Sequence, residues 1–199
     1  MRIAVDAMGS DRAPLPEIEG ALEAARAGDF EIVLVGDEAR LKPALDGRVR
    51  NGRISVVHAS QAITMQDDPI AAVRRKRDSS LRVAIRLLKE GKVDAVVSAG
   101  NTGAVVVASR LMLGFIEGVS RAPLCTMLPT AKAPVCVLDQ GANVDCTARH
   151  LCDFAEMGTV FSMHVLGVKS PRVGLLNIGE ETVKGNDLAK TVHRYLTAA

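Results

Sequence analysis

Short runs of apolar, mostly β-branched residues alternate with helical patterns along this chain. Most of the runs are continuously apolar, as expected where helices cover both faces of a sheet. The repetition of strand, helix and strand predicts a three-layer α/β fold with a largely parallel sheet and helices on both faces. The predicted strands are residues 3–5, 31–35, 54–57, 95–98, 124–128, 135–138 and 173–176, and the predicted helices are 15–27, 70–77, 80–90, 102–113, 148–166 and 184–197.

Composition bounds the class of protein. The chain has 199 residues, of which 48% are hydrophobic, so we expect one substantial core and a single α/β domain over residues 1–199. A net charge of +2 and an aromatic content of 3% give no basis for a nucleic-acid partner. Four cysteines, with no signal peptide before the first strand pattern, indicate a reduced, cytoplasmic protein. The longest uncharged stretch, residues 95–109, is too short and too polar to span a bilayer.

Small, polar, glycine-containing loops follow four of the predicted strands. They are residues 6–11, 98–104, 139–143 and 177–181. In a parallel sheet, ligands bind beyond the carboxyl ends of the strands, often at the N-termini of helices. Four such loops together predict a shared rim for a ligand.

The loop 98–103 is the strongest candidate for an anion site. Gly100 and Gly103 allow close approach of backbone to a ligand, and Asn101 or Thr102 can cap the helix that follows. The alternative is a simple turn between strand and helix, whose polar groups only cap the helix. The loop matches neither the Walker A motif nor G-x-G-x-x-G, so nucleotide binding is not indicated.

Further polar residues lie in or near the other loops. Asp139 and Asn143 could orient a polar ligand or form an ordinary cap or Asx turn. Asp6 and Asp11 could act as acid, base or metal ligand, or bond to local backbone. Lys184 is expected to open the last helix, where a cation opposes the helix dipole. It either compensates the charge of a bound anion or is simply solvated.

A run of basic side chains continues from residue 74 into the predicted helix 80–90. Within that helix, three of them form one stripe opposite the apolar face. The run is either a solvated surface or a docking site for an acidic partner. Its members are Arg74, Arg75, Lys76, Arg77, Arg82, Arg86 and Lys89.

Metal binding and covalent catalysis find little support. Cys146, His150 and Cys152 lack zinc-type spacing and a fourth ligand. Cys125 and Cys136 lie in strand runs and are expected in the core. The chain has no nucleophile elbow and no H-E-x-x-H motif. We therefore expect no metal and no cofactor.

Six segments resemble one known family. In chain order they are residues 5–11 (VDAMGSD), 72–80 (AVRRKRDSS), 98–104 (SAGNTGA), 138–143 (LDQGAN), 173–179 (VGLLNIG) and 184–186 (KGN). On these segments the chain resembles bacterial phosphate acyltransferase, the acyl-ACP:phosphate acyltransferase of the PlsX type. Ser10 and Gln140 stand where the family more often has glycine and an aliphatic residue. Family members continue well past Ala199, so the chain resembles a truncated form, the N-terminal part of a longer fold.

The resemblance implies a specific reaction and setting. The family transfers a fatty acyl group from acyl carrier protein to inorganic phosphate, giving acyl phosphate for phosphatidic acid synthesis. Its fold is similar to phosphate acetyltransferase and to the isocitrate and isopropylmalate dehydrogenases. Its members are soluble, cytoplasmic homodimers, some of which associate with the inner face of the membrane. Two alternatives stay open: a phosphate acyltransferase that uses coenzyme A thioesters, and an inactive binding or scaffold fragment.

The reaction that the resemblance implies suggests a hypothesis for the roles of the candidate residues. A phosphate oxygen attacks the thioester carbonyl, so the site needs an anion cradle and donors for the oxyanion. Lys184 would offset the phosphate charge, Asn143 or Asn186 would donate to the oxyanion, and Asp139 would position them. The basic residues between 74 and 89 would dock acyl carrier protein, which is acidic. The residues expected to hold phosphate and substrate are Asp6, Gly9, Asp11, Ser98, Gly100, Asn101, Thr102 and Gly103.

Overall fold

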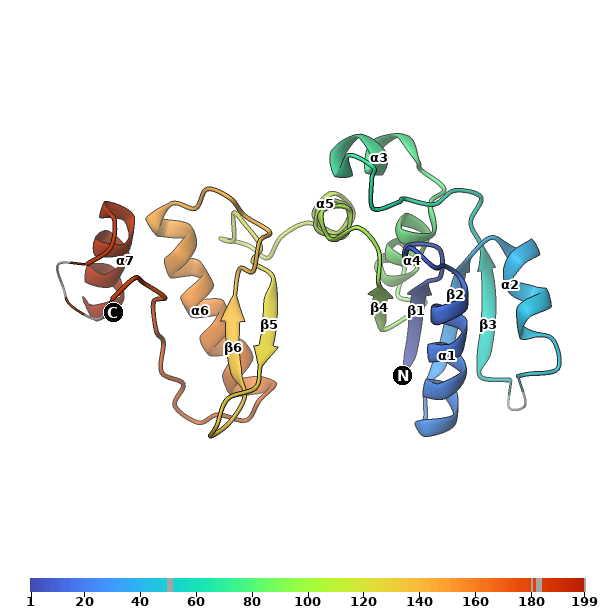
Figure 1. Ribbon diagram of the computed structural model, residues 1–199, viewed down its shortest axis with the longest axis horizontal. Coiled ribbons are helices and arrows are strands. Elements are labelled where there is room, and N and C mark those ends of the chain that lie inside the picture. Colours follow the sequence, from blue (N-terminus) through green and yellow to red (C-terminus); the bar gives the residue numbers. More distant parts are fainter. Residues whose placement is uncertain (50–51, 180, 182–183, 199) are drawn as a thin grey trace. The chain divides into compact units, whose positions relative to one another are not determined.

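Figure 1 shows the computed structural model, which describes residues 1–49, 52–179, 181 and 184–198. Its chain divides into two compact units, Met1–Gly114 and Phe115–Ala199. They are called the N-terminal unit and the C-terminal unit, and each is described by itself.

The N-terminal unit is built on a four-stranded parallel sheet in the order β3-β2-β1-β4. The register pairs Asp6, at the end of β1, with Val35 in β2 and with Ser98 in β4. The polar loops that follow β1 and β4 therefore leave the same edge of the sheet. The four predicted strands of this unit are confirmed: β1 (Arg2–Asp6), β2 (Glu31–Gly36), β3 (Ile54–His58) and β4 (Ala95–Ser98).

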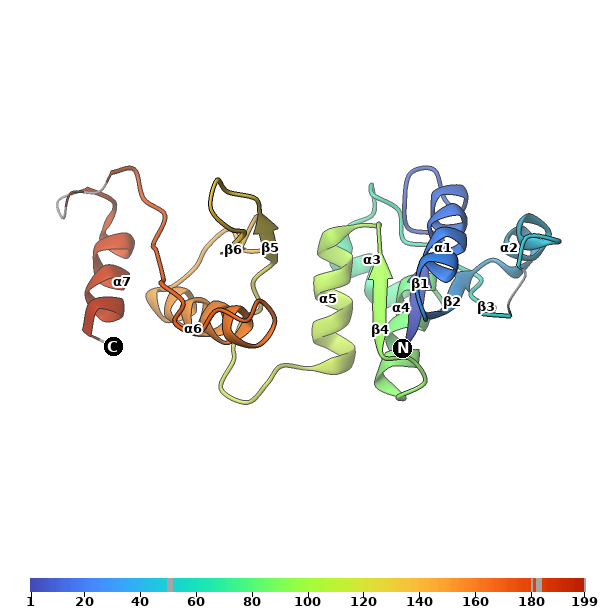
Figure 2. The same cartoon turned by 90° about the horizontal axis from the view of Figure 1, so that it is seen from below.

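Helices cover both faces of this sheet, as Figures 1 and 2 show. On one face, Ile32 and Leu34 of β2 belong to a buried cluster with residues of α1 and α2. On the other face, Val33 and Val35 pack with Val83 of α4. Alternate side chains of one strand thus enter two cores, which explains why its sequence is continuously apolar. The helices are α1 (Leu15–Ala27), α2 (Glu38–Leu45), α3 (Pro69–Arg75), α4 (Ser80–Lys89) and α5 (Thr102–Leu113).

The helix starts follow from local chemistry. Helix α1 begins after Pro14 and carries Pro16 in its first turn, where a missing N–H costs nothing. Asp68 caps α3 by accepting a hydrogen bond from the backbone N–H of Ala71 at 2.7 Å. Helix α5 packs against α3 and α4 through a third buried cluster, so the start of α5 is fixed relative to both.

The C-terminal unit differs from the predicted parallel arrangement. Its strands β5 (Cys125–Leu128) and β6 (Val135–Leu138) form a two-stranded antiparallel sheet. Helix α6 (Ala148–His164) packs against β6 so closely that a Cβ added at Gly158 would lie 2.4 Å from Leu138 Cδ1. The loop 139–143 therefore follows a strand of this antiparallel pair, and not a strand of the four-stranded parallel sheet.

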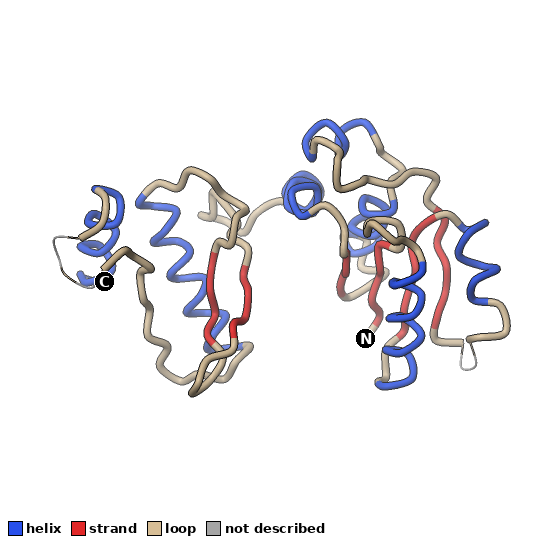
Figure 3. The backbone as a smooth tube through the Cα atoms, in the orientation of Figure 1, coloured by secondary structure: helices blue, strands red, loops and turns tan. Residues whose placement is uncertain are grey.

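Two further expectations for the C-terminal unit are wrong. Residues 173–176, predicted as a strand, form a loop between α6 and α7, drawn in tan in Figure 3. Helix α7 (Asp187–Ala198) begins three residues later than predicted, because the side-chain oxygen of Asn186 caps it by accepting from the N–H of Ala189 at 2.9 Å. Within the described residues, no helix combines the length and the apolar character that a membrane span needs.

Candidate functional site: the loops after β1 and β4

The loops after β1 and β4 meet in a tight contact supported by Asp6. The Asp6 side chain is buried, and its Oδ2 accepts a hydrogen bond from Ser98 Oγ at 2.8 Å. Ser98 Oγ in turn accepts from the backbone N–H of Gly100 at 3.2 Å. A Cβ added at Gly9 would lie 2.6 Å from Asp6 Oδ2 and 3.0 Å from the Cα of Gly100, and a Cβ added at Gly100 would lie 3.0 Å from the Cα of Gly9, so glycine at both positions allows this close approach. Asp6 and Ser98 therefore shape the loops and use their polar atoms on each other.

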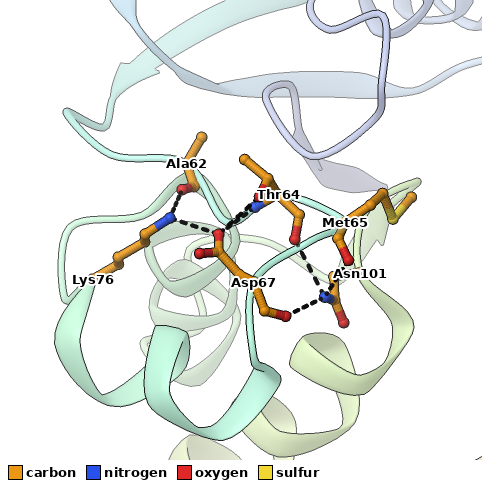
Figure 4. Close-up of polar contacts among 6 residues, drawn as sticks. All are labelled: Ala62, Thr64, Met65, Asp67, Lys76 and Asn101. Atoms are coloured by element: carbon orange, nitrogen blue, oxygen red, sulfur yellow. Dashed lines mark hydrogen bonds and ion pairs between the residues drawn. The ribbon is translucent and has the colours of Figure 1, made fainter.

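Asn101 is bound to a third loop, which the sequence did not indicate. Its amide nitrogen donates to the backbone oxygens of Thr64, Met65 and Asp67 at 3.2, 3.4 and 3.1 Å. Its side-chain oxygen accepts from the N–H of Ala104 at 3.0 Å and so caps α5. Figure 4 shows the amide between the loop carbonyls. Both ends of this side chain are engaged within the protein, so Asn101 clamps the loop 64–67 to the start of α5.

The backbone at the start of α5 offers N–H groups that can donate to a ligand. None of the hydrogen bonds among the described residues uses the N–H of Thr102 or of Gly103. These groups belong to the first turn, where N–H groups have no partner within the helix and the helix dipole favours an anion. A Cβ added at Gly103 would lie 2.7 Å from Pro69 Cγ, so this glycine also lets α3 approach closely. The start of α5 can hold an oxyanion beside the contact of Gly9 and Gly100.

Asp11 lies apart from these hydrogen bonds, in the wall of a cavity of about 590 Å³. Most of the cavity wall is apolar and comes from α1, β1 and β4. Glu17 lines the same cavity, and neither oxygen of its buried carboxylate has a partner among the described residues. Asp11 is therefore exposed at an apolar cavity and does not support the loop contact.

In the C-terminal unit, Asp139 and Asn143 contact each other. Asn143 Nδ2 donates to Asp139 Oδ1 at 3.0 Å and to the backbone oxygen of Ala122 at 3.1 Å. Asp139 has a φ of 66°, in the left-handed region that aspartate tolerates better than most residues. Burial and the negative charge of Asp139 raise the pKa of Cys146, while Arg121 acts in the opposite direction. Cys146 and Arg121 were not among the predicted site residues.

Lys184 and Asn186 lie before α7. Lys184 is exposed, and its backbone oxygen accepts from Asn177 Nδ2 at 3.3 Å. No hydrogen bond or ion pair within the described part of this unit joins Lys184 or Asn186 to Asp139 or Asn143. Glu180, in the predicted loop 177–181, lies outside the described residues.

The basic residues between 74 and 89 divide into two groups. Lys76 forms an ion pair with Asp67 at 2.6 Å, and Arg82 donates to the backbone oxygen of Val73. These two cations therefore bind to groups within the protein. The remaining five are exposed and could meet a partner: Arg74, Arg75, Arg77, Arg86 and Lys89.

The cysteines are free thiols. Cys125 is exposed and Cys136 is half-buried, so their expected place in the core is wrong; among the described residues, the sheet that carries them has two strands. The Sγ atoms of Cys125 and Cys136 lie 3.2 Å apart. Burial and the hydrogen bond with Cys125 raise the pKa of Cys136 to about 11. Across the described ranges, no group of three His, Cys, Asp or Glu side chains could hold a metal ion.

Comparison with known proteins identifies one family. The family described as fatty acid synthesis protein matches residues 1–199. The phosphate acyltransferase of Desulforamulus reducens is 49% identical over 196 residues, covering 98% of this chain and 59% of the relative. That of Moorella thermoacetica is 48% identical over 199 residues, covering 100% and 59%. The chain thus spans about 59% of the length of these relatives.

A solved structure supports the fold. The EutD phosphotransacetylase from Staphylococcus aureus matches with a TM-score of 0.69 and 17% identity, over 100% of this chain and 64% of that chain. This likeness confirms the α/β fold class.

Proposed function

The chain belongs to the fatty acid synthesis protein family, in which its curated relatives are phosphate acyltransferases, and from this premise we propose that it transfers a fatty acyl group to inorganic phosphate. The donor is the thioester of acyl carrier protein. The product is an acyl phosphate, which supplies phospholipid synthesis.

The start of α5 carries this proposal. The free N–H groups of Thr102 and Gly103 and the positive end of the helix dipole favour a phosphate dianion. The contact of Gly9 with Gly100 leaves no side chain there to compete with the ligand. Asp6 and Ser98 hold this backbone in place before phosphate arrives, so little reorganisation opposes binding.

Phosphate needs no covalent help from the protein for this reaction. One of its oxygens attacks the thioester carbonyl, the new C–O bond forms, and the C–S bond breaks with departure of the thiolate. The protein's task is to position phosphate and to stabilise the oxyanion. For the C-terminal unit, the roles of Lys184, Asn143, Asn186 and Asp139 stay predictions.

The exposed basic residues in α3, in α4 and between them support acyl carrier protein as the donor. Arg74, Arg75 and Arg77 lie close together in sequence, and Arg86 and Lys89 are exposed on α4. Charges of this kind speed encounter with an acidic partner and make it sensitive to salt. A KM for acyl carrier protein that rises with ionic strength supports docking here, whereas an unchanged KM, with coenzyme A thioesters used equally well, favours the alternative donor.

The family setting supplies the remaining proposals. We expect residues 1–199 to form the N-terminal part of one longer α/β fold that works as a cytoplasmic homodimer. Contact with the inner face of the membrane belongs to the same expectation.

Thiol release from palmitoyl-acyl carrier protein tests the proposed function. The assay compares reactions with and without phosphate, traps acyl phosphate as the hydroxamate, and includes a chain extended past Ala199 to family length. Phosphate-dependent release with hydroxamate formation supports the proposal. Lys184→Ala should raise the activation free energy by about a few kcal/mol. Absence of release in both chains would refute acyl transfer to phosphate.

A further inference from the structure

We propose that Lys76 is a positioning residue for the phosphate-binding loop: through Asp67 it fixes residues 62–68, to which Asn101 ties the start of α5. This role rests on the proposed function. It gives Lys76 a task different from the exposed cations around it.

Lys76 holds the loop at two points. Its Nζ lies 2.6 Å from Asp67 Oδ2 and donates to the backbone oxygen of Ala62 at 2.9 Å. The same carboxylate oxygen accepts from the N–H and the hydroxyl of Thr64 at 2.7 and 3.1 Å. The side chains of Lys76 and Asp67 are 31% and 25% exposed, so the pair is only partly screened by water. Three donors on one oxygen fix the fold of the loop (Figure 4).

Asn101 links this loop to the helix. Its nitrogen reaches the carbonyls of Thr64, Met65 and Asp67, and its oxygen caps the N–H of Ala104. The three carbonyl oxygens converge on the Asn101 nitrogen, and this requires that the loop keeps its shape. The shape of the loop therefore sets the position of the Asn101 amide.

Loss of the Lys76 charge should propagate along this path. Asp67 would keep only the donors of Thr64, and the loop would move more freely. The Asn101 amide would then lose its fixed partners, and the cap on Ala104 would open more often. The neighbouring N–H groups of the first turn of α5 would present a less ordered site to phosphate.

The test compares Lys76→Met and Lys76→Arg with a matched control. Lys42→Met removes the same charge from an exposed pair with Glu38, which lies on α2 and has no assigned role. Two quantities are measured on the 199-residue chain by amide NMR: the Kd for inorganic phosphate and the hydrogen-exchange rate of the Ala104 amide. The KM for acyl carrier protein is measured on the chain of family length.

Lys76→Met should weaken phosphate binding about 10-fold, by analogy with metal sites, where loss of a group that supports a ligand costs about 10–100-fold in affinity. It should also speed Ala104 exchange and leave the KM for acyl carrier protein unchanged. Lys76→Arg should restore most of the phosphate affinity, and Lys42→Met should match the wild type.

A double variant separates positioning from direct contact. If Lys76 acts through Asp67, adding Asp67→Asn to Lys76→Met should weaken phosphate binding no further. Additive losses would assign Lys76 to phosphate itself, and a change only in the KM for acyl carrier protein would assign it to docking; either result overturns the proposal. If phosphate affinity and exchange respond as expected but thiol release is absent, the positioning role stands and the proposed reaction fails.

Discussion

Gly9→Ala should destabilise the N-terminal unit. The added Cβ would lie 2.6 Å from Asp6 Oδ2, 3.0 Å from Gly100 Cα and 3.2 Å from Gly100 N. Backbone atoms of Gly100 cannot rotate away, and the Asp6 carboxylate is held by Ser98 Oγ at 2.8 Å. Overpacking of this kind costs about 1–3 kcal/mol of folding free energy. Each kcal/mol corresponds to a Tm change of about 2–4 °C in a chain of this size.

Gly20→Ala is the matched control for this prediction. Gly20 lies inside α1, and a Cβ added there meets no atom within 4 Å. Alanine in a helix interior is more stable than glycine by about 0.5–1 kcal/mol. Urea unfolding followed by circular dichroism should therefore give changes of opposite sign for the two variants. A Gly9→Ala variant as stable as the wild type would refute the close contact of the two loops.

Three further predictions concern Asn101, the ion pair and Cys146. Asn101→Asp keeps the cap on α5 but places a carboxylate against three carbonyl oxygens. The free energy of unfolding should therefore fall by about 1–3 kcal/mol. An unchanged urea midpoint would contradict the clamping role of Asn101. The hydrogen bonds from Lys76 and Thr64 hold the pKa of Asp67 below its ordinary value. The stabilisation from Asp67 is therefore present above about pH 4 and is lost as the pH falls through the lowered pKa. When the pH is lowered, the urea midpoint of the Lys76→Met variant should therefore fall less than that of the wild type. Equal falls would count against the ion pair of Lys76 with Asp67. Burial and the charge of Asp139 raise the pKa of Cys146. Asp139→Asn should therefore lower that pKa and speed alkylation of this thiol at mildly alkaline pH. Slower alkylation would show that the charge of Asp139 does not raise the pKa.

The sequence pattern predicted the N-terminal sheet because its signal is local. Each strand is an apolar run flanked by turn residues. Because strands covered on both faces are continuously apolar, their burial can be predicted from the run itself. Helix α2 was missed because it has only eight residues and contains Pro43. The run 173–176 has the same composition as a strand but forms a loop, since apolar character does not specify a pairing partner. The same limit explains why the antiparallel pairing of β5 with β6 was not foreseen.

The site was predicted in part, for a related reason. Asp6 and Ser98 meet because neighbouring parallel strands end at the same edge, which the fold class already implied. The partners of Asn101 are backbone oxygens 34 to 37 residues away. Every residue has a backbone oxygen, so residue identity does not indicate such a partner. Lys76 resembles its basic neighbours in sequence, and only its ion pair with Asp67 sets it apart.

An amide NMR titration of the 199-residue chain with inorganic phosphate is the sharpest test of phosphate binding at the start of α5. We predict saturable shifts at Thr102 and Gly103, with smaller ones at Gly9 and Gly100, and their loss in the Gly9→Ala variant. Saturable binding elsewhere with no response at the start of α5, or no binding at all, would contradict it.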